Sequence, residues 1–211
     1  NVYIKQVSYL LNLLGININT VPVLDVRRKF TNNVIGNRSF SSNSSLVSKM
    51  GKICIQKFHE NHIGTIIKHI PGHGLSTDDS HLKLPSVKHN YKLLNKVDFF
   101  PFKNQRAFLA MTAHVIYKSI DPNNSATHSK KIMKIIRKKI AFKNIIMSDD
   151  ISMKALKYSI SENTTRAFNA GCNLVLHCNG NFKEMLTVAK NSPLLSHFVI
   201  KKTSQLTNII R

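Results

Sequence analysis

Short apolar runs alternate with longer amphipathic segments along the chain. Runs rich in β-branched residues predict five strands: "INTVPV" near Ile18, "GTIIKHI" from Gly64, "FLAMTAHV" from Phe108, "KNIIMSD" from Lys143 and "NLVLHC" from Asn173. Helical spacing of apolar positions predicts helices at residues 46–61, 91–94, 130–139, 162–170 and 182–190. The opening residues predict a further amphipathic helix that ends near Gly15.

This order of strands and helices predicts an α/β fold. Strand, helix, strand, helix implies a parallel sheet built from right-handed β-α-β units. The strands lack strict alternation of apolar and polar residues, which is expected when helices or other layers cover both faces of a sheet.

Polar residues end or follow four of the five predicted strands. They are Arg38, Lys68, His69, His114, Asp149 and Asp150. In α/β proteins the carboxyl ends of parallel strands meet at one edge, where ligands bind. The sequence therefore predicts a functional site at this edge.

The segment "IIKHIPGHGLSTDDSHLKLP", residues 66–85, contains three histidines, two adjacent aspartates, two glycines and two prolines. In an extended backbone Asp79 and His81 point to the same side. A carboxylate beside an imidazole fixes the ring's tautomer, and the ordinary pKa of histidine, ~6.5, suits proton transfer near neutral pH. We interpret the segment as a catalytic loop with His81 as general acid/base; the alternative is an incidental surface loop.

Metal and phosphate binding fit this loop less well. Pro71 and Gly72 break the helix that would place His69 and His73 on one face, as a helical zinc site requires. The "PGHG" glycines lack the G-K-[ST] ending of a phosphate loop. We therefore predict no metal and no cofactor.

The acidic pair at the end of "IIMSDDISM" has two possible chemical roles. A carboxylate that ends an apolar strand is well oriented, so Asp149 is a candidate nucleophile or metal ligand. One member of the pair can instead cap the following helix, a role we expect for Asp150 or Ser152.

The net charge of +21 arises from 31 Lys and Arg against 10 Asp and Glu. Such a charge can indicate a nucleic-acid partner. However, the lysines are spread along the chain, and the densest run, "SKKIMKIIRKK" from Ser129, keeps its isoleucines on one helical face. We interpret that run as a solvated helix face and predict no nucleic-acid partner.

Membrane and disulfide classes are also not expected. The chain has no run of about 18 uncharged apolar residues, so no membrane span is predicted. Its three cysteines form no C-x-x-C pair, which argues against a disulfide framework or a zinc ribbon and favours a reducing cytoplasm.

Five motifs in order resemble one family. "KHIPGHG" with "DDSH", then "MTAHVIY", "IIMSDDISM" and "AGCNLVLHC" are similar to the bacterial β-N-acetylhexosaminidases of glycoside hydrolase family three, the NagZ type. The resemblance runs from "VPVLDV" and "IGNRSF" to "LVLHC" and so covers most of the chain.

The resemblance implies a (β/α)8 TIM-type barrel and a retaining exo-glycosidase that removes terminal N-acetylglucosamine from cytoplasmic muropeptides in peptidoglycan recycling. Asp149 would be the nucleophile, His81 the acid/base and Asp79 its supporting carboxylate. The residues that hold the sugar would be Arg38, Lys68 and His69. The substrate partner would be a muropeptide or another amino sugar.

Two departures from the family pattern shape the expectations. Ile70 stands where the family has an aromatic residue, and only about five of eight barrel strands can be counted. We therefore expect residues 1–211 to be the C-terminal part of a single catalytic barrel, with about three strands before Asn1, or the product of a decayed gene. The alternatives are a family-three β-glucosidase and an inactive truncated barrel that acts as a basic binding protein.

Overall fold

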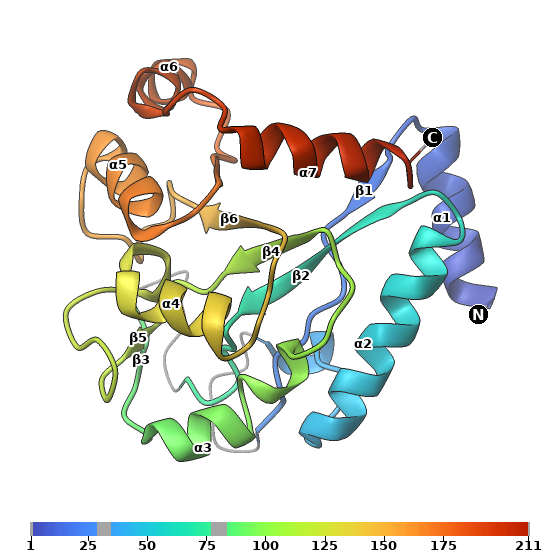
Figure 1. Ribbon diagram of the computed structural model, residues 1–211, viewed down its shortest axis with the longest axis horizontal. Helices are drawn as coiled ribbons and strands as arrows, with labels where there is room; N and C mark the ends of the chain where they lie inside the picture. Colours follow the sequence, from blue (N-terminus) through green and yellow to red (C-terminus); the bar gives the residue numbers. More distant parts are fainter. Residues whose placement is uncertain (1, 29–34, 77–83, 211) are drawn as a thin grey trace.

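A computed structural model describes residues 2–28, 35–76 and 84–210 (Figure 1). Its main sheet has five parallel strands in the order β1-β2-β4-β6-β7. These strands are β1 (Ile18–Asn19), β2 (Gly64–Ile70), β4 (Leu109–Thr112), β6 (Ile145–Asp150) and β7 (Leu174–Leu176). A small second sheet pairs β3 (Ser86–Val87) with β5 (Ile116–Tyr117). Each strand that we predicted from the sequence is present.

Seven α-helices and three short 3-10 helices connect the strands in the described residues. The α-helices are α1 (Val2–Leu13), α2 (Ser44–His59), α3 (Tyr91–Lys96), α4 (Lys130–Lys138), α5 (Ile160–Ala170), α6 (Phe182–Asn191) and α7 (His197–Thr207). The 3-10 helices are η1 (Gly36–Arg38), η2 (Phe100–Phe102) and η3 (Ala126–His128). The sequence pattern predicted six of the α-helices and missed α7.

Polar N-caps explain where most of these helices begin. At α2, α3, α4, α5, α6 and α7 an Asn or Ser side chain accepts a hydrogen bond from a backbone N–H of the first turn. Such a cap satisfies a donor that the helix itself leaves unpaired. At the other end of α1, Gly15 has a φ of +72°, which fits the expected stop.

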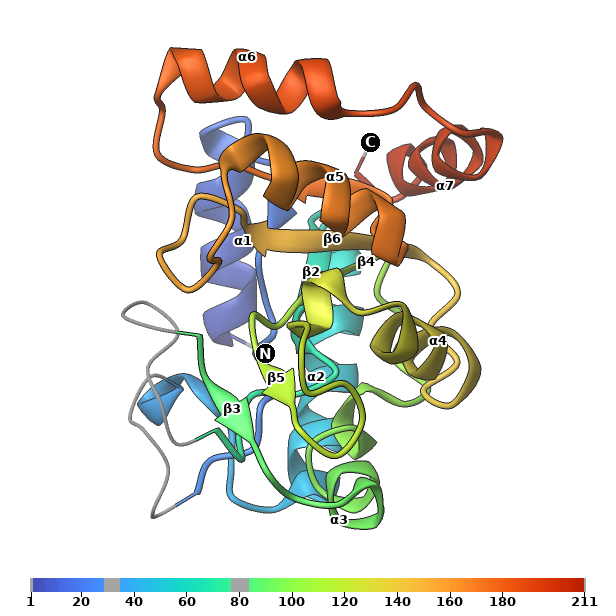
Figure 2. The same cartoon turned by 90° about the vertical axis from the view of Figure 1, so that its left-hand side faces the viewer.

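The sheet buries both of its faces, as the strand composition predicted. On one face Ile67, Ala110 and Ile146 pack with residues of α2, α4 and α5. On the other face Ile66, Met111 and Met147 pack with Leu206 of α7. Figures 1 and 2 show α7 running along the side of the sheet opposite α2.

The α/β class and the parallel sheet are confirmed, whereas a closed barrel is not observed. Within the described residues β1 and β7 are the edge strands and do not pair with each other, so the five strands form a curled, open sheet. None of the described helices has the length and apolar content needed to cross a bilayer.

The basic run on α4 is a solvated helix face, as predicted. Ile132 and Ile136 are buried in the core, while Lys130, Lys134 and Lys138 are exposed. Arg137 differs from the lysines because its guanidinium donates to the Phe142 and Asn144 carbonyls and to the Asn173 side chain.

Candidate active site

The carboxyl ends of β2 and β6 bring three of the predicted site residues together. The Nε2 atom of His69 lies 3.9 Å from Oδ2 of Asp149. Lys68 precedes His69 on β2, and its ammonium donates to the Thr20 hydroxyl at 3.3 Å. The parallel pairing of β1, β2, β4 and β6 produces this convergence, because residues at the ends of neighbouring strands face one edge.

Among the described residues, the carboxylate of Asp149 has unused hydrogen-bonding capacity. Its Oδ1 accepts one bond, from the backbone N–H of Asp150 at 2.8 Å. Its Oδ2 faces His69 at 3.9 Å, which is too long for a hydrogen bond. The side chain is 22% exposed, so a ligand can reach it from the open edge of the sheet.

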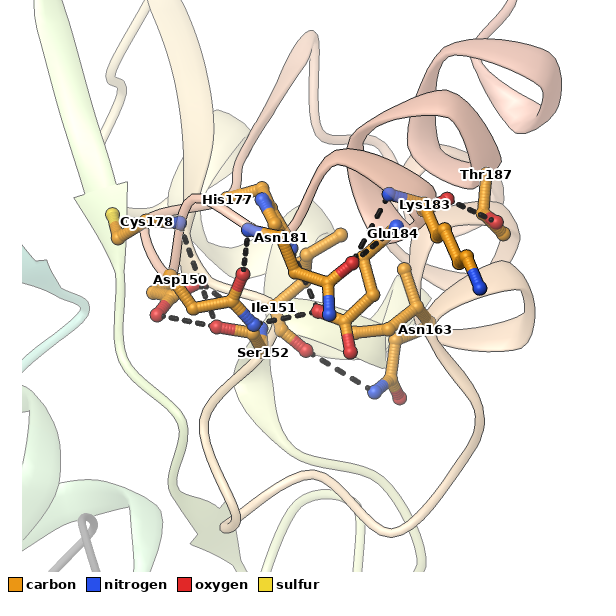
Figure 3. Close-up of polar contacts among 12 residues, drawn as sticks. Asp150, Ile151, Ser152, Asn163, His177, Cys178, Asn181, Lys183, Glu184 and Thr187 are labelled. Carbon is orange, nitrogen blue, oxygen red and sulfur yellow. Dashed lines mark hydrogen bonds and ion pairs between the residues drawn. The ribbon is translucent and has the colours of Figure 1, made fainter.

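Asp150 is the opposite case, because donors of its own loop occupy its carboxylate. Oδ1 accepts from the Ser152 N–H at 3.0 Å and from the Cys178 N–H at 3.1 Å, and the Ser152 hydroxyl lies 2.8 Å from both oxygens. Figure 3 shows these contacts between the end of β6 and the loop after β7. Asp150 therefore holds two loops together.

Neither member of the acidic pair caps a helix, and our expectation for Asp150 or Ser152 was wrong in this respect. The helix that follows, α5, begins later and is capped by Ser159, whose hydroxyl accepts from the Glu162 N–H. Asp150 instead caps the turn that starts at Ile151. Asn163 stabilises the same turn by donating to the Ile151 carbonyl at 3.3 Å.

The loop after β7 is tied to α6 as well as to Asp150. Glu184 accepts from Nδ2 of Asn179 at 2.6 Å and lies 2.9 Å from Nε2 of His177 (Figure 3). The hydrogen bonds of His177 and Asn179 lower the pKa of Glu184 and keep its carboxylate charged. This side of the site is therefore a loop fixed at three points.

Lys68 supplies positive charge near Asp149, and Arg38 lies close enough to Lys68 to repel its charge. Burial lowers the pKa of Lys68, and the positive charge of Arg38 lowers it further, whereas the charges of Asp149 and Asp25 raise it. Arg38 ends η1 and is exposed, so the structure places it at the rim. Positive charge near a carboxylate suits the binding of a polar, hydroxyl-rich ligand.

His114 does not face the ligand side of the edge. Its Nε2 donates to the Asp150 carbonyl at 3.0 Å, and its Nδ1 lies 2.7 Å from the Thr127 hydroxyl. Burial lowers the pKa of His114, so the ring is neutral at pH 7. His114 fixes the backbone next to Asp149, and it affects the site only by holding that backbone in place.

The two residues that we predicted as the acid/base pair, Asp79 and His81, lie outside the described residues. The segment leading to them is described up to Ser76. Gly72 has a φ of +138°, and a Cβ there would lie 2.6 Å from Cβ of Asp98, so this turn requires glycine. The Tyr117 hydroxyl donates to the Gly72 carbonyl and fixes the turn from below.

Sequence reasoning missed one site residue, Asp25, which follows β1. Its side chain is 0% exposed and lies 2.7 Å from Nδ1 of His69. The available signal was a lone carboxylate inside the apolar run "VPVLDV", since a buried charge requires a partner.

The described residues contain no group of three or more His, Cys, Asp or Glu arranged to hold a metal ion. The described site instead contains the partly exposed carboxylate of Asp149, the buried His69 beside it and the cationic Lys68, with Arg38 near Lys68. Such a set can bind a neutral polyol and attack an electrophilic carbon.

Comparisons with known proteins point in the same direction. The sequence profile of the Glycosyl hydrolase family 3 N terminal domain matches residues 5–209. A beta-hexosaminidase of Nitrosomonas eutropha is 33% identical over 184 residues, which are 83% of this chain and 53% of that protein. One from Idiomarina loihiensis is 35% identical over 170 residues, which are 79% of this chain and 51% of that protein.

Solved structures agree with the sequence comparisons. Native NagZ from Neisseria gonorrhoeae superposes with a TM-score of 0.84 at 30% identity, over 94% of this chain and 58% of that one. A glycoside hydrolase family 3 beta-N-acetylglucosaminidase from Paenibacillus gives a TM-score of 0.82 at 26% identity, over 94% of this chain and 40% of that one. The chain spans about half the length of the curated relatives it matches.

Proposed function

Because the chain belongs to glycoside hydrolase family 3, we propose that it carries the catalytic edge of a retaining β-N-acetylhexosaminidase. The observation that supports this most directly is the contrast at the end of β6, where, among the described residues, several donors occupy the Asp150 carboxylate and one backbone N–H meets that of Asp149. The relatives at 33% and 35% identity are both beta-hexosaminidases, which supports an amino sugar as the substrate.

In the first step Asp149 is the nucleophile. One of its carboxylate oxygens attacks the anomeric carbon, and the bond from that carbon to the leaving oxygen breaks. His81 gives its proton to the leaving oxygen, and Asp79 orients the imidazole and stabilises its charged form. The result is a covalent glycosyl-Asp149 intermediate and a free alcohol.

In the second step water replaces the enzyme. Neutral His81 takes a proton from a water molecule, whose oxygen attacks the anomeric carbon while the bond to Asp149 breaks. Asp149 returns to a carboxylate and His81 to its protonated form. Two displacements at one carbon preserve the β-configuration of the sugar.

Arg38, Lys68 and His69 hold the sugar ring in this proposal. Lys68 and His69 are consecutive on β2, and His69 lies beside Asp149, so ring hydroxyls bound here place the anomeric carbon near the nucleophile. Positioning of this kind removes part of the entropic barrier.

The wider setting is also part of the proposal. We expect the five strands to belong to one (β/α)8 catalytic barrel of which residues 1–211 form the C-terminal part, since each edge strand, β1 and β7, has one neighbour in the main sheet. The physiological substrate would be a cytoplasmic muropeptide that carries a terminal N-acetylglucosamine, released during peptidoglycan recycling.

The test is hydrolysis of 4-nitrophenyl N-acetyl-β-glucosaminide, followed by proton NMR of the sugar first formed. The proposal predicts release of nitrophenol and initial formation of the β-anomer. Initial formation of the α-anomer would contradict the retaining mechanism. Preferential cleavage of 4-nitrophenyl β-glucoside would favour a β-glucosidase, and the absence of release from either compound would contradict a glycosidase activity of this chain.

A further inference from the structure

Asp25 is a fully enclosed carboxylate beside the site. It follows the β-bridge between Val23 and Lys68, and its carboxylate lies beneath the end of β2 with 0% exposure. A buried carboxylate is costly unless donors surround it. The groups that surround it therefore indicate what it does.

Three donors of one short segment meet this carboxylate. The backbone N–H of His69 lies 3.3 and 3.2 Å from its two oxygens, and the backbone N–H of His73 donates at 2.7 Å. The third donor is the Nδ1 atom of His69, at 2.7 Å. Asp25 thus binds both ends of the turn from His69 to His73.

Asp25 remains ionised in this environment. Burial alone would raise its pKa, but the electrostatic attraction and the hydrogen bonds of the His69 and His73 N–H groups outweigh burial and leave the pKa below the ordinary value for aspartate. An ionised carboxylate can only accept hydrogen bonds. The Nδ1 atom of His69 must therefore carry the proton in this contact.

The position of that proton determines what His69 offers to a ligand. In a neutral imidazole with the proton on Nδ1, Nε2 is an acceptor. Nε2 points toward Asp149, whose Oδ2 is also an acceptor, and the two atoms stay 3.9 Å apart. A hydrogen-bond donor of a ligand, such as a sugar hydroxyl, can therefore bind between Nε2 of His69 and Oδ2 of Asp149.

We propose that Asp25 is a positioning residue that fixes the Nδ1–H tautomer of His69 and anchors the turn from His69 to His73 beside Asp149. Without it the ring can place its proton on Nε2 and donate to Asp149. That bond would occupy the nucleophile and remove the acceptor for the ligand hydroxyl. The catalytic consequence rests on the proposed function, whereas the tautomer does not.

Asp98 provides a matched control in the same part of the molecule. It is also fully buried, and among the described residues it accepts a hydrogen bond from the Leu75 N–H at 3.2 Å and makes none to His69. Burial raises the pKa of Asp98 to about 7. Asp98→Asn therefore makes the same chemical change as Asp25→Asn without removing a partner of the ring.

The experiment combines nitrogen-15 NMR of the imidazole rings with steady-state kinetics. In the wild-type protein the His69 spectrum should show a protonated Nδ1 and a bare Nε2. In Asp25→Asn it should change toward protonation at Nε2, with kcat/KM lower by about 10- to 100-fold and changes in both KM and kcat. Asp98→Asn should keep the wild-type tautomer and kcat/KM within about threefold.

Two results would overturn the inference. One is a wild-type His69 with its proton on Nε2, a measurement that needs no variant and so holds even if Asp25→Asn fails to fold. The other is a folded Asp25→Asn protein with unchanged tautomer and kcat/KM. If the wild type hydrolyses no hexosaminide, the proposed function fails while the NMR result still decides the role of Asp25.

Discussion

On each side of Asp149 a carboxylate accepts hydrogen bonds from several groups and so fixes a loop or turn, but the groups that it fixes differ in their chemistry. On the β1–β2 side, the buried carboxylate of Asp25 gathers the turn from His69 to His73. On the β6–β7 side, the carboxylate of Asp150 gathers Ser152 and the backbone of Cys178. Within the described parts of the chain, several donors meet each of these two carboxylates, whereas the carboxylate of Asp149 accepts one hydrogen bond.

The difference lies in what each carboxylate holds. Asp25 binds an imidazole whose other nitrogen faces the site, so it affects protonation as well as position. Asp150 binds backbone N–H groups and a hydroxyl, so it affects position alone. In a site with several carboxylates, the hydrogen-bonding capacity that each one leaves unused in the folded protein is a better guide to the reactive carboxylate than its position in the sequence.

The largest effect is expected for Asp149→Ala. Removal of the nucleophile should lower kcat on an aryl N-acetyl-β-glucosaminide by about 10⁴-fold or more, since no neighbouring group replaces it. Azide should partly restore turnover and give the α-glycosyl azide, because it attacks from the vacated side. A larger loss in Asp150→Ala than in Asp149→Ala would reverse the comparison.

His81→Ala should have the next largest effect, and the effect should depend on the leaving group. General acid catalysis contributes about 10²- to 10⁴-fold, and good leaving groups need little protonation. Glycosylation of poor leaving groups should therefore slow much more than that of nitrophenolate. Equal losses on both substrates would show that His81 is a structural or binding residue. Asp79→Asn should reproduce the pattern in weaker form.

Asp150→Asn tests the structural side of the comparison. The amide keeps one acceptor for at least four donor contacts, so we expect a loss of about 1–3 kcal/mol in the free energy of unfolding. Because Asp150 does not touch the His69 ring, the His69 tautomer should remain that of the wild type. Urea unfolding and imidazole NMR measure the two quantities. A change of tautomer in this variant would remove the distinction between the two sides.

The smallest effect on activity is expected for Asp98→Asn, which should instead change how the stability of the protein depends on pH. The pKa of Asp98 is about 7 in the folded protein, above its value in an unfolded chain. The protonated carboxyl therefore stabilises the fold fully below about pH 4, and this contribution is lost as pH rises through about 7. Asparagine stays neutral at every pH. The free energy of unfolding of the variant should therefore rise relative to that of the wild type between pH 4 and 8, by up to a few kcal/mol. A stability difference that is constant over this range would contradict the assignment.

The sequence predicted the helices and strands correctly for the most part, but its local patterns did not predict whether the sheet closes into a barrel. β2 matches the predicted run "GTIIKHI" because the β-branched residues of that run, one threonine and three isoleucines, favour a strand and Pro71 follows them. The helix α7 was missed because its apolar residues, Val199 and Leu206 among them, recur weakly among polar ones. Whether the sheet closes depends on pairing at its edges, which no local pattern contains.

The sequence could predict those candidate site residues that lie at the ends of strands. Asp149, Lys68 and His69 end strands, and strand ends are readable from periodicity. Asp25 was not predictable in this way, because its role depends on contacts with residues 44 and 48 positions away. The separate duties of Asp149 and Asp150 also required three-dimensional contacts, since the two residues are neighbours in sequence.

The most direct test of the account is covalent trapping of the nucleophile. A 2-fluoro or 5-fluoro glycosyl donor with a good leaving group should form a slowly hydrolysed glycosyl-enzyme, whose labelled peptide can be sequenced by mass spectrometry. The account predicts one label, on Asp149, and none in Asp149→Ala. A label on Asp150, or full turnover of the donor with no covalent species, would contradict it.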